Sequence, residues 1–362
     1  MKILDRYILG KYLISFTFIV ILMSLLTVVV DFAEKVEDFM QPTGPTTYEI
    51  IFDYYLNFVP YITSLLIPLY ALIAVIYFTS RLAANSEIIA IIGSGVNFYR
   101  ILYPYVLEAF IIASLHFYAN HYIFPISNKT RTQFENTYIW KHNFQGPTDN
   151  IHLFASKNEE MYLQHYNRKD STGRMFSLMR YDSTGLERPF TLTAQRIKLL
   201  EYPNKWRLTS YHIRYVDGIK ERLVTGNQLD TFLRLTNKDL SKRDNLKDAM
   251  TTPELKAYIQ EELSKGTGLV LPFRVELYRR TADPFSIFVL TLIGVSVASR
   301  KMRGGMGWHL VLGMIVSALY IFMGKFSMTF STHGGLPPII GAWVPNLLFI
   351  GVAIYMLLRA QK

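Results

Sequence analysis

The chain has 362 residues, of which 50% are hydrophobic, and it carries a formal net charge of +10 with no cysteine. Its hydrophobic residues gather in runs at both ends, while most of the charge lies in one central block. This division excludes an ordinary soluble enzyme, and the lack of cysteine excludes disulfides, thiolate metal sites and thiol catalysis.

Six stretches are apolar enough to cross a bilayer, since roughly 20 apolar helical residues span a hydrocarbon core of about 30 Å. The fourth has only 16 uncharged residues, so its helix is expected to begin earlier, in VELYRR (275–280). The first follows a basic start without a small-residue cleavage site, which indicates a retained anchor rather than a signal peptide. The predicted spans cover residues 12–30, 54–80, 101–124, 284–299, 304–324 and 339–358.

Lys and Arg in the short loops predict the orientation of these spans. Ten bases would share one side of the membrane, and the opposite short loops hold only Lys35. We therefore expect both termini in the cytoplasm and residues of about 125–275 outside, as a translocated domain. The ten bases are Lys2, Arg6, Lys11, Arg81, Arg100, Arg300, Lys301, Arg303, Arg359 and Lys362.

The same bases explain most of the net charge, because they face only Asp5 and Glu87 on the predicted cytoplasmic side. In residues 125–283, 26 bases are scattered among 19 acids. A nucleic-acid-binding surface would require clustered bases, so no nucleic-acid partner is expected.

The central block alternates apolar and polar residues as β-strands do, and turn sequences such as DSTG and VDGIK separate the strands. This spacing predicts a sandwich, a jelly roll or a partial barrel. A helix is expected next, with Thr252 as its N-cap and Pro253 in its first turn. Strands are predicted at 160–167, 174–181, 190–202, 205–215 and 231–235. The apolar positions expected to form the core are Met161, Leu163, Phe176, Leu178, Phe190, Leu192, Ile197, Trp206, Leu208 and Ile213.

Motifs of common catalytic and nucleotide-binding sites are missing from the sequence. It contains no GxxxxGK[ST] loop, no HExxH, no GxSxG, and no His and carboxylate cluster at metal-ligand spacing. We therefore expect no catalytic, cofactor or metal site in this chain. Energy for vectorial work would have to come from an ion gradient or from a partner protein.

The segment at 80–102, between the second and third spans, predicts a short amphipathic helix. It begins at a polar Asn85-Ser86 cap, continues as EIIAII from Glu87, and breaks at Gly93 and Gly95. Such a helix either docks into a cleft of a soluble partner or lies on the lipid surface. Glu87 would then contact the partner, or would only stabilise the helix dipole.

Several segments together resemble one family, the LptF/LptG (YjgP/YjgQ) permeases of lipopolysaccharide-export ABC transporters. Residues 81–100 are similar to the family's coupling-helix pattern, roughly RLxxxSEIxAxxxxGxxxxR. LDRYILGKYL (4–13) resembles its N-terminal interfacial helix. The other similar segments, in the same order, are FPISNKTR (124–131), VELYRRTADPF (275–285), GVSVASRKMRGG (294–305) and LPPIIGAWVPNLLF (336–349).

The resemblance implies an α-helical membrane protein with six transmembrane helices and an inserted periplasmic all-β domain that is jelly-roll-like. Residues 1–124 would hold the interfacial helix, three spans and the coupling helix at about 84–93. The β-domain would occupy 125–268, with a linking helix at about 253–264, and 269–362 would hold the last three spans.

The resemblance also implies partners and a function. Family members pair with a paralogous permease in the bacterial inner membrane and engage a cytoplasmic ABC ATPase dimer, which binds ATP and Mg. They pass lipopolysaccharide to a periplasmic bridge jelly-roll protein. By this analogy, ATPase coupling would fall to Glu87, Ser86, Ile88 and Ile91. The alternative is a membrane anchor or scaffold whose β-domain binds periplasmic proteins without moving lipid.

Two lysines are candidates for lipopolysaccharide contact, because lipid A carries phosphates beside its acyl chains. Lys35 lies beyond the first apolar run, and Lys325 lies in the outer third of the fifth span. Either lysine could instead only snorkel towards the interface. Lys35 could also pair with Asp31 or Glu34 on its own helix.

Two further groups of polar residues lie in or near the spans. Glu276, Arg279 and Arg280 have the i,i+3 and i,i+4 spacing of ion pairs on a helix. We expect them to form a structural anchor, with a substrate clamp as the alternative. The third span contains Glu108, His116 and His121, which either form a proton path or are single polar residues facing the bundle interior.

Overall fold

The computed structural model describes residues 3–139, 149–156, 158–167, 170–182, 187–201, 204–235, 246–265, 270–299 and 305–360. The chain forms two compact units. One unit is a helical bundle made of Met1–Lys141, Asp248–Leu255 and Leu271–Lys362. The other contains a β-sheet and is made of His142–Lys247 and Lys256–Val270.

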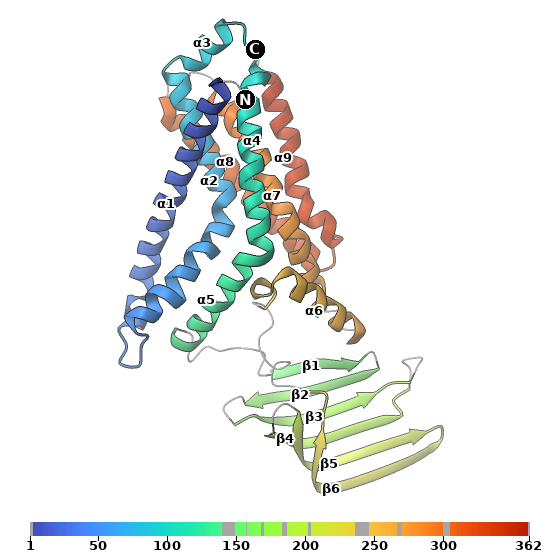
Figure 1. Ribbon diagram of the computed structural model, residues 1–362. Helices are drawn as coiled ribbons and strands as arrows, with labels where there is room; N and C mark the ends of the chain where they lie inside the picture. Colours follow the sequence, from blue (N-terminus) through green and yellow to red (C-terminus); the bar gives the residue numbers. More distant parts are fainter. Residues whose placement is uncertain are drawn as a thin grey trace. The chain divides into compact units, whose positions relative to one another are not determined.

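Among the described residues, six helical segments are long and apolar enough to cross a membrane, which confirms the predicted spans. Both chain ends and the short helix α3 lie at one end of the bundle, here called the terminal end (Figure 1). The bundle elements are α1 (Ile3–Phe39), η1 (Glu49–Tyr55), α2 (Leu56–Ala84), α3 (Glu87–Gly93), α4 (Phe98–Tyr118), η2 (Ala119–Ile123), α5 (Phe124–Tyr138), α7 (Leu271–Ala298), α8 (Gly305–Thr332) and α9 (Pro338–Ala360).

α1 is one continuous helix of 37 residues, so the segment that resembles an interfacial helix, LDRYILGKYL (4–13), belongs to the same helix as the first span. No proline interrupts this stretch, and the fully buried Ile8 and Tyr12 hold its first turns against the bundle. At 1.5 Å per residue, α1 is about 55 Å long. It therefore extends beyond the roughly 30 Å hydrocarbon core of a bilayer.

The helices of the third and fourth spans also extend well beyond their predicted limits. The helix that contains the third span continues through η2 and α5 to Tyr138, whereas its end was expected near residue 124. Pro125 does not end this helix, because it lies in the first turn of α5, where a missing N–H is tolerated. The helix of the fourth span does begin before residue 284, but it starts at Leu271, four residues before the predicted VELYRR segment.

α7 is the most enclosed span of the bundle. In the most apolar 18-residue stretch of each helix, 67% of α7 is buried, compared with 11% of α1 and 17% of α8. Gly294 of α7 permits a close approach by α2, since a Cβ at this position would lie 2.8 Å from Leu72 Cδ1. Many apolar side chains of α1 and α8, such as Leu25 and Phe322, are exposed within the described chain, as expected for helices that face lipid.

The β-unit contains one antiparallel sheet whose strand order follows the chain, β1-β2-β3-β4-β5-β6 (Figure 1). The sequence missed β1 and most of β6, because both are rich in polar residues. The left-handed Gly218, with φ of 57°, forms the β5–β6 turn that VDGIK predicted. The strands are β1 (Asp149–Ser156), β2 (Glu159–Asn167), β3 (Thr172–Arg180), β4 (Phe190–Glu201), β5 (Lys205–Asp217) and β6 (Lys220–Phe232).

One row of residues crosses the whole sheet without pairing to its neighbours. The register of each of the five ladders continues on both sides of this row but omits the row itself. Three of its members have left-handed backbone, with φ of 51° at Asn150, 53° at Met175 and 52° at Ser210. We call this row the crease; it consists of Asn150, Gln164, Met175, Gln195, Ser210 and Asn227.

The crease changes which side chains face inward. In β2 the buried positions change from Leu163 to Tyr166, and in β4 they change from Ala194 to Ile197. Side chains in a regular strand point to alternate faces. In a regular strand, apolar residues three apart, such as Leu163 and Tyr166, would therefore point to opposite faces of the sheet. The crease restores one continuous apolar surface, and both parts contribute to one buried cluster that includes Trp206.

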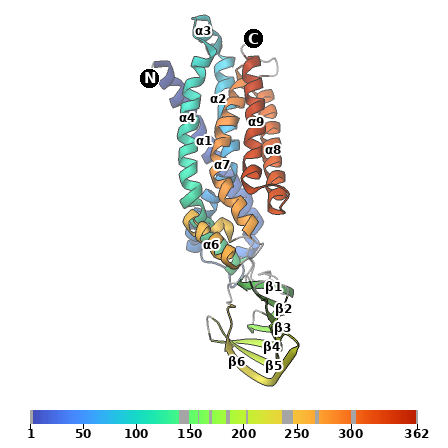
Figure 2. The same cartoon turned by 90° about the vertical axis from the view of Figure 1, so that its right-hand side faces the viewer.

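The sheet also doubles back at the crease, as the strong curvature in Figure 2 shows. Arg180 and Phe232 lie on opposite sides of the crease, five residues from it in β3 and β6. In a flat sheet they would be separated by roughly 33 Å along the strand direction. Instead both line one hollow of about 340 Å³. A single bent sheet therefore provides the layered core that the sequence predicted.

α6 (Thr252–Lys265) begins one residue earlier than its predicted cap implies. Thr251 precedes the helix, and its amide and hydroxyl both donate to Glu254 Oε2 at 2.7 Å, as in a capping box. Thr252, the predicted N-cap, uses its hydroxyl for contacts with the bundle instead.

Candidate functional site

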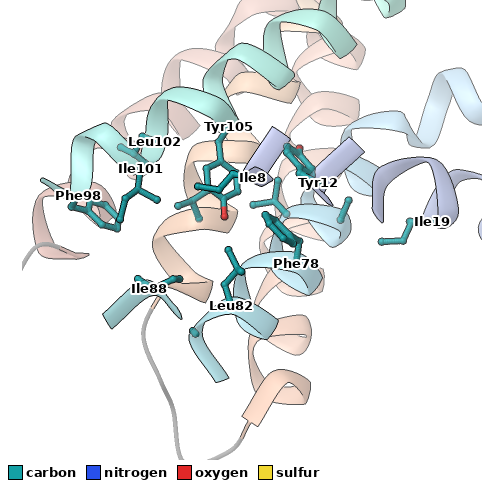
Figure 3. Close-up of a cluster of buried hydrophobic side chains, with 14 of the residues drawn as sticks. Ile8, Tyr12, Ile19, Phe78, Leu82, Ile88, Phe98, Ile101, Leu102 and Tyr105 are labelled. Atoms are coloured by element: carbon teal, nitrogen blue, oxygen red, sulfur yellow. The ribbon is translucent and has the colours of Figure 1, made fainter. Parts of the chain in front are cut away.

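A cluster of buried apolar side chains fixes α3 to the terminal end of the bundle (Figure 3). Ile88 of α3 is only 4% exposed and shares this cluster with Leu82 of α2 and Phe98 of α4. Ile8 and Tyr12 of α1 belong to the same cluster. Three other helices, α1, α2 and α4, therefore contribute to the cluster that holds α3.

The exposed face of α3 is also apolar. Ile89 and Ile92 are 59% and 44% exposed, whereas Ile91 is packed against the buried cluster together with Ile88. Helical residues three apart share a face, so the four isoleucines form an inner pair and an outer pair. Ile88 and Ile91, which were predicted to take part in ATPase coupling, therefore face the bundle, and Ile89 and Ile92 provide the exposed surface of α3.

Glu87 lies at the start of α3 and is held by residues from two elements. Tyr7 of α1 donates its hydroxyl hydrogen to Glu87 Oε2 at 3.1 Å, and Asn85 donates from Nδ2 to Oε1 at 3.2 Å. Ser86 makes no side-chain capping bond, contrary to the predicted Asn85-Ser86 cap, and its backbone is left-handed with φ of 63°. The Glu87 carboxylate is therefore positioned by Tyr7 and Asn85.

A second polar contact ties α1 to α4 at the same end. Arg100 donates to Asp5 at 2.6 Å, and the Asp5 side chain is only 2% exposed. No local sequence pattern indicated these two contacts, because Tyr7 and Asp5 lie 80 and 95 residues before their partners.

At the opposite end of the bundle, Lys35 belongs to a network of charged side chains. Its ammonium lies 2.7 Å from Asp31 and 3.4 Å from Glu135, and it also contacts the Tyr54 hydroxyl. Arg131 binds the same Glu135 oxygen at 2.6 Å. The predicted partner Asp31 is present, while Glu135 and Arg131 come from α5, which the sequence did not place in the bundle. We call these five residues the Lys35 cluster.

The Lys35 cluster lies against aromatic rings. The Lys35 ammonium is 4.8 Å from the Tyr54 ring centre and 5.7 Å from that of Phe58. The Arg131 guanidinium is 4.0 Å from the Tyr61 ring centre. The charges of two cations and two carboxylates thus cancel in a site with little exposure to solvent, and the aromatic faces add cation–π attraction.

Glu276, Arg279 and Arg280 form the ion-pair group that their spacing predicted. Arg279 donates to both oxygens of Glu276 at 2.8 and 2.9 Å and to Asp283 at 2.6 Å. Arg280 donates to Glu276 at 2.9 Å and is 2% exposed. Because Arg280 and Glu276 are almost fully buried, this geometry is that of an anchor inside the bundle.

The same group fixes the first turn of α6. The Thr252 hydroxyl lies 3.3 Å from Arg280 Nη1 and 2.7 Å from His121 Nδ1. His121 lies on η2, the π-helical turn that precedes Pro125. The residue that opens α6 is therefore bonded to both the third and the fourth spans.

Lys325 lies apart from these groups, on the exposed surface of α8. No carboxylate of the described residues lies within ion-pair distance of Lys325. Unlike Lys35, Lys325 therefore has an exposed side chain.

The polar residues of the third span lie inside the bundle. Glu108 is fully buried and His116 is 1% exposed, and they lie eight residues apart on one face of α4. Glu108 makes no hydrogen bond within the described part of the chain. His121 lies beyond the end of α4, on η2, and is bonded to Thr252. Among the described residues, no group of three or more His, Asp or Glu side chains is arranged for a metal ion.

Six spans, a β-unit inserted between the third and the fourth, and a short helix bound to one end of the bundle define a multi-pass membrane protein with an inserted β-domain. The family comparison specifies it further. Residues 6–359 match the family described as lipopolysaccharide export system permease LptF/LptG. The chain belongs to this family. No curated protein sequence matches the chain.

Proposed function

We propose that this chain is one permease subunit of an ABC transporter that extracts lipopolysaccharide from the bacterial inner membrane. It would pair with a paralogous LptF/LptG-type permease and pass lipopolysaccharide through its periplasmic β-domain to a bridge protein of the jelly-roll type. ATP and Mg would be bound by a cytoplasmic ATPase dimer. Family membership over residues 6–359 supports this proposal.

The observation that carries the proposal is the geometry of α3. Its outer face presents Ile89 and Ile92 beside the fixed carboxylate of Glu87, and its inner face belongs to a cluster joined to α1, α2 and α4. An ATPase that holds the outer face would thereby move three spans. A helix that merely lay on lipid would not require this attachment to the bundle.

The charge distribution supports the orientation. The terminal end contains Arg6, Lys11, Arg81, Arg100 and Arg359, and bases near the membrane favour the cytoplasmic side. The ATPase-facing helix and both termini would then be cytoplasmic. The Lys35 cluster would lie at the periplasmic level, where the phosphates of lipid A are found.

Purification of the tagged chain from native membranes tests the assembly. We expect the ATPase and a paralogous permease to copurify, and depletion of the chain to leave lipopolysaccharide in the inner membrane. Normal lipopolysaccharide export after depletion would contradict transport and favour a scaffold whose β-domain only binds periplasmic proteins.

Substitutions in α3 test the coupling site. Glu87→Ala and the double change Ile89→Ser with Ile92→Ser should each reduce copurification of the ATPase, because they remove the charge or the apolar surface offered to it. Tyr7→Phe is the matched control, since it removes one bond to Glu87 but keeps the carboxylate. Equal ATPase recovery with all variants would remove α3 from the proposed interface.

A further inference from the structure

The crease is the one line along which the sheet is not held by strand pairing. Each of the five ladders omits its crease residues, although register is kept on both sides. Left-handed backbone at the non-glycine residues Asn150, Met175 and Ser210 adds strain in alternate strands. A line that lacks ladder bonds and stores strain in three strands is the softest line for bending the sheet.

Opening at the crease would separate the two inner faces at the mouth, but it would not unpack the crease side chains themselves. Gln164, Met175, Gln195 and Asn227 have exposed side chains, and Ser210 is partly exposed. The apolar residues on either side, such as Leu163 and Ile197, lie on the inner surface. Crease side chains therefore stay in water when the angle between the two parts changes.

The space between the two parts is wedge-shaped. Near the crease it is closed, since a Cβ added to Gly173 would lie 2.7 Å from Leu163 Cδ1 and 2.9 Å from Ile197 Cγ1. At the free strand ends, five residues from the crease, it widens to the hollow of about 340 Å³. A wedge that is tight at its apex and open at its mouth opens further by rotation about the apex.

The mouth has a mixed lining. Leu178, Leu192 and Leu233 supply apolar surface, and Arg180 and Arg234 supply positive charge. Arg180 is paired with Glu159 at 3.0 Å, but its side chain remains 58% exposed. A volume of this size is within the range of sites for small ligands or single alkyl chains. The lining therefore suits a chain with an anionic group at one end.

We propose that the crease is a hinge about which the two parts of the sheet open and close, so that the mouth admits and releases an acyl chain. The rotation itself follows from the sheet alone, and the identity of the occupant rests on the proposed function. Closure without an occupant is stabilised by the buried cluster around Trp206 and Leu208. The hinge would thereby release a chain without unfolding either part.

Distances between spin labels on the full-length chain in lipid nanodiscs test the hinge, because the protein has no native cysteine. Arg222→Cys and Glu201→Cys place labels on exposed positions on opposite sides of the crease. Lys198→Cys and Gln228→Cys place them on exposed positions on one side and form the matched control. Each pair is measured alone and with added lipid A.

We expect the pair across the crease to have a broader distance distribution than the control pair on one side. With lipid A, the distances of the pair across the crease should become longer. If the distribution across the crease is as narrow as the control, the hinge is wrong whatever lipid A does. If it is broad but lipid A leaves it unchanged, the hinge is supported and the passage of lipid through this domain is overturned.

Discussion

The ammonium of Lys35 is surrounded by groups that make its burial tolerable. Asp31 and Glu135 neutralise it, Arg131 compensates the second carboxylate, and Tyr54 and Phe58 present ring faces. Breaking a buried ion pair costs more than the pair itself contributes, because the remaining charge stays desolvated. A lipid phosphate could therefore bind Lys35 only by replacing one of its carboxylates.

Lys35→Met should destabilise the bundle by about 3 kcal/mol, because Asp31 loses its cation. Thermal melting of the purified protein in detergent would measure this as a lower Tm. Lys35→Met combined with Asp31→Asn should recover part of the loss, and Lys35→Arg should retain most of the stability. An unchanged Tm for Lys35→Met would show that the cluster contributes nothing to stability.

Glu254 gives the first turn of α6 a predictable pH dependence. Hydrogen bonds from the hydroxyl and the amide of Thr251 lower the pKa of Glu254 below its ordinary value of 4.5. A lowered folded-state pKa contributes stability above pH 4.5, and this stability is lost as pH falls through the lowered pKa. The Tm difference between wild type and Glu254→Gln should therefore be largest at neutral pH and should shrink below pH 4.5. A constant difference would contradict the capping role.

At the scale of elements, α3 and the crease both depend on packing for their stability. The seven residues of α3 are too few for a stable isolated helix. Packing of Ile88 and Ile91 against α2 and α4 supplies the stability. The crease, in turn, is stable because the inner surface continues across it.

Ser210→Gly should raise the stability of the β-domain by about 1 kcal/mol, since glycine adopts left-handed backbone without a Cβ clash. The adjacent change Thr209→Gly is the control and should lower stability, because glycine weakens a strand interior. Hydrogen exchange of strand amides in the full chain would report both effects. If both variants were destabilised equally, the left-handed conformation of Ser210 would carry no strain.

Much of this architecture could be predicted from the sequence, because charge is absent where helices cross the membrane. The length of the helix that contains the third span could not be predicted, because η2 and α5 continue past Pro125 with polar residues that the bundle buries. The crease left a signal, namely two successive polar residues in strands that otherwise alternate, such as Gln164-His165 and Gln195-Arg196. The Tyr7–Glu87 contact left none, because it joins residues 80 apart.

At the scale of the whole molecule, the proposed orientation can be tested with single cysteines. Ser94→Cys follows α3 and Asn158→Cys lies between β1 and β2, and both positions are exposed. In spheroplasts, a membrane-impermeant maleimide should label Asn158→Cys at once and Ser94→Cys only after permeabilisation. Labelling in the reverse order would invert the topology.

The strand order of the β-domain has a consequence for its biogenesis. Each strand pairs only with the strands directly before and after it in the chain, so every ladder closes over a short loop. Such local pairing favours fast folding, because little chain entropy is lost before each contact forms. The domain can therefore assemble hairpin by hairpin during synthesis, before the last three spans have been made.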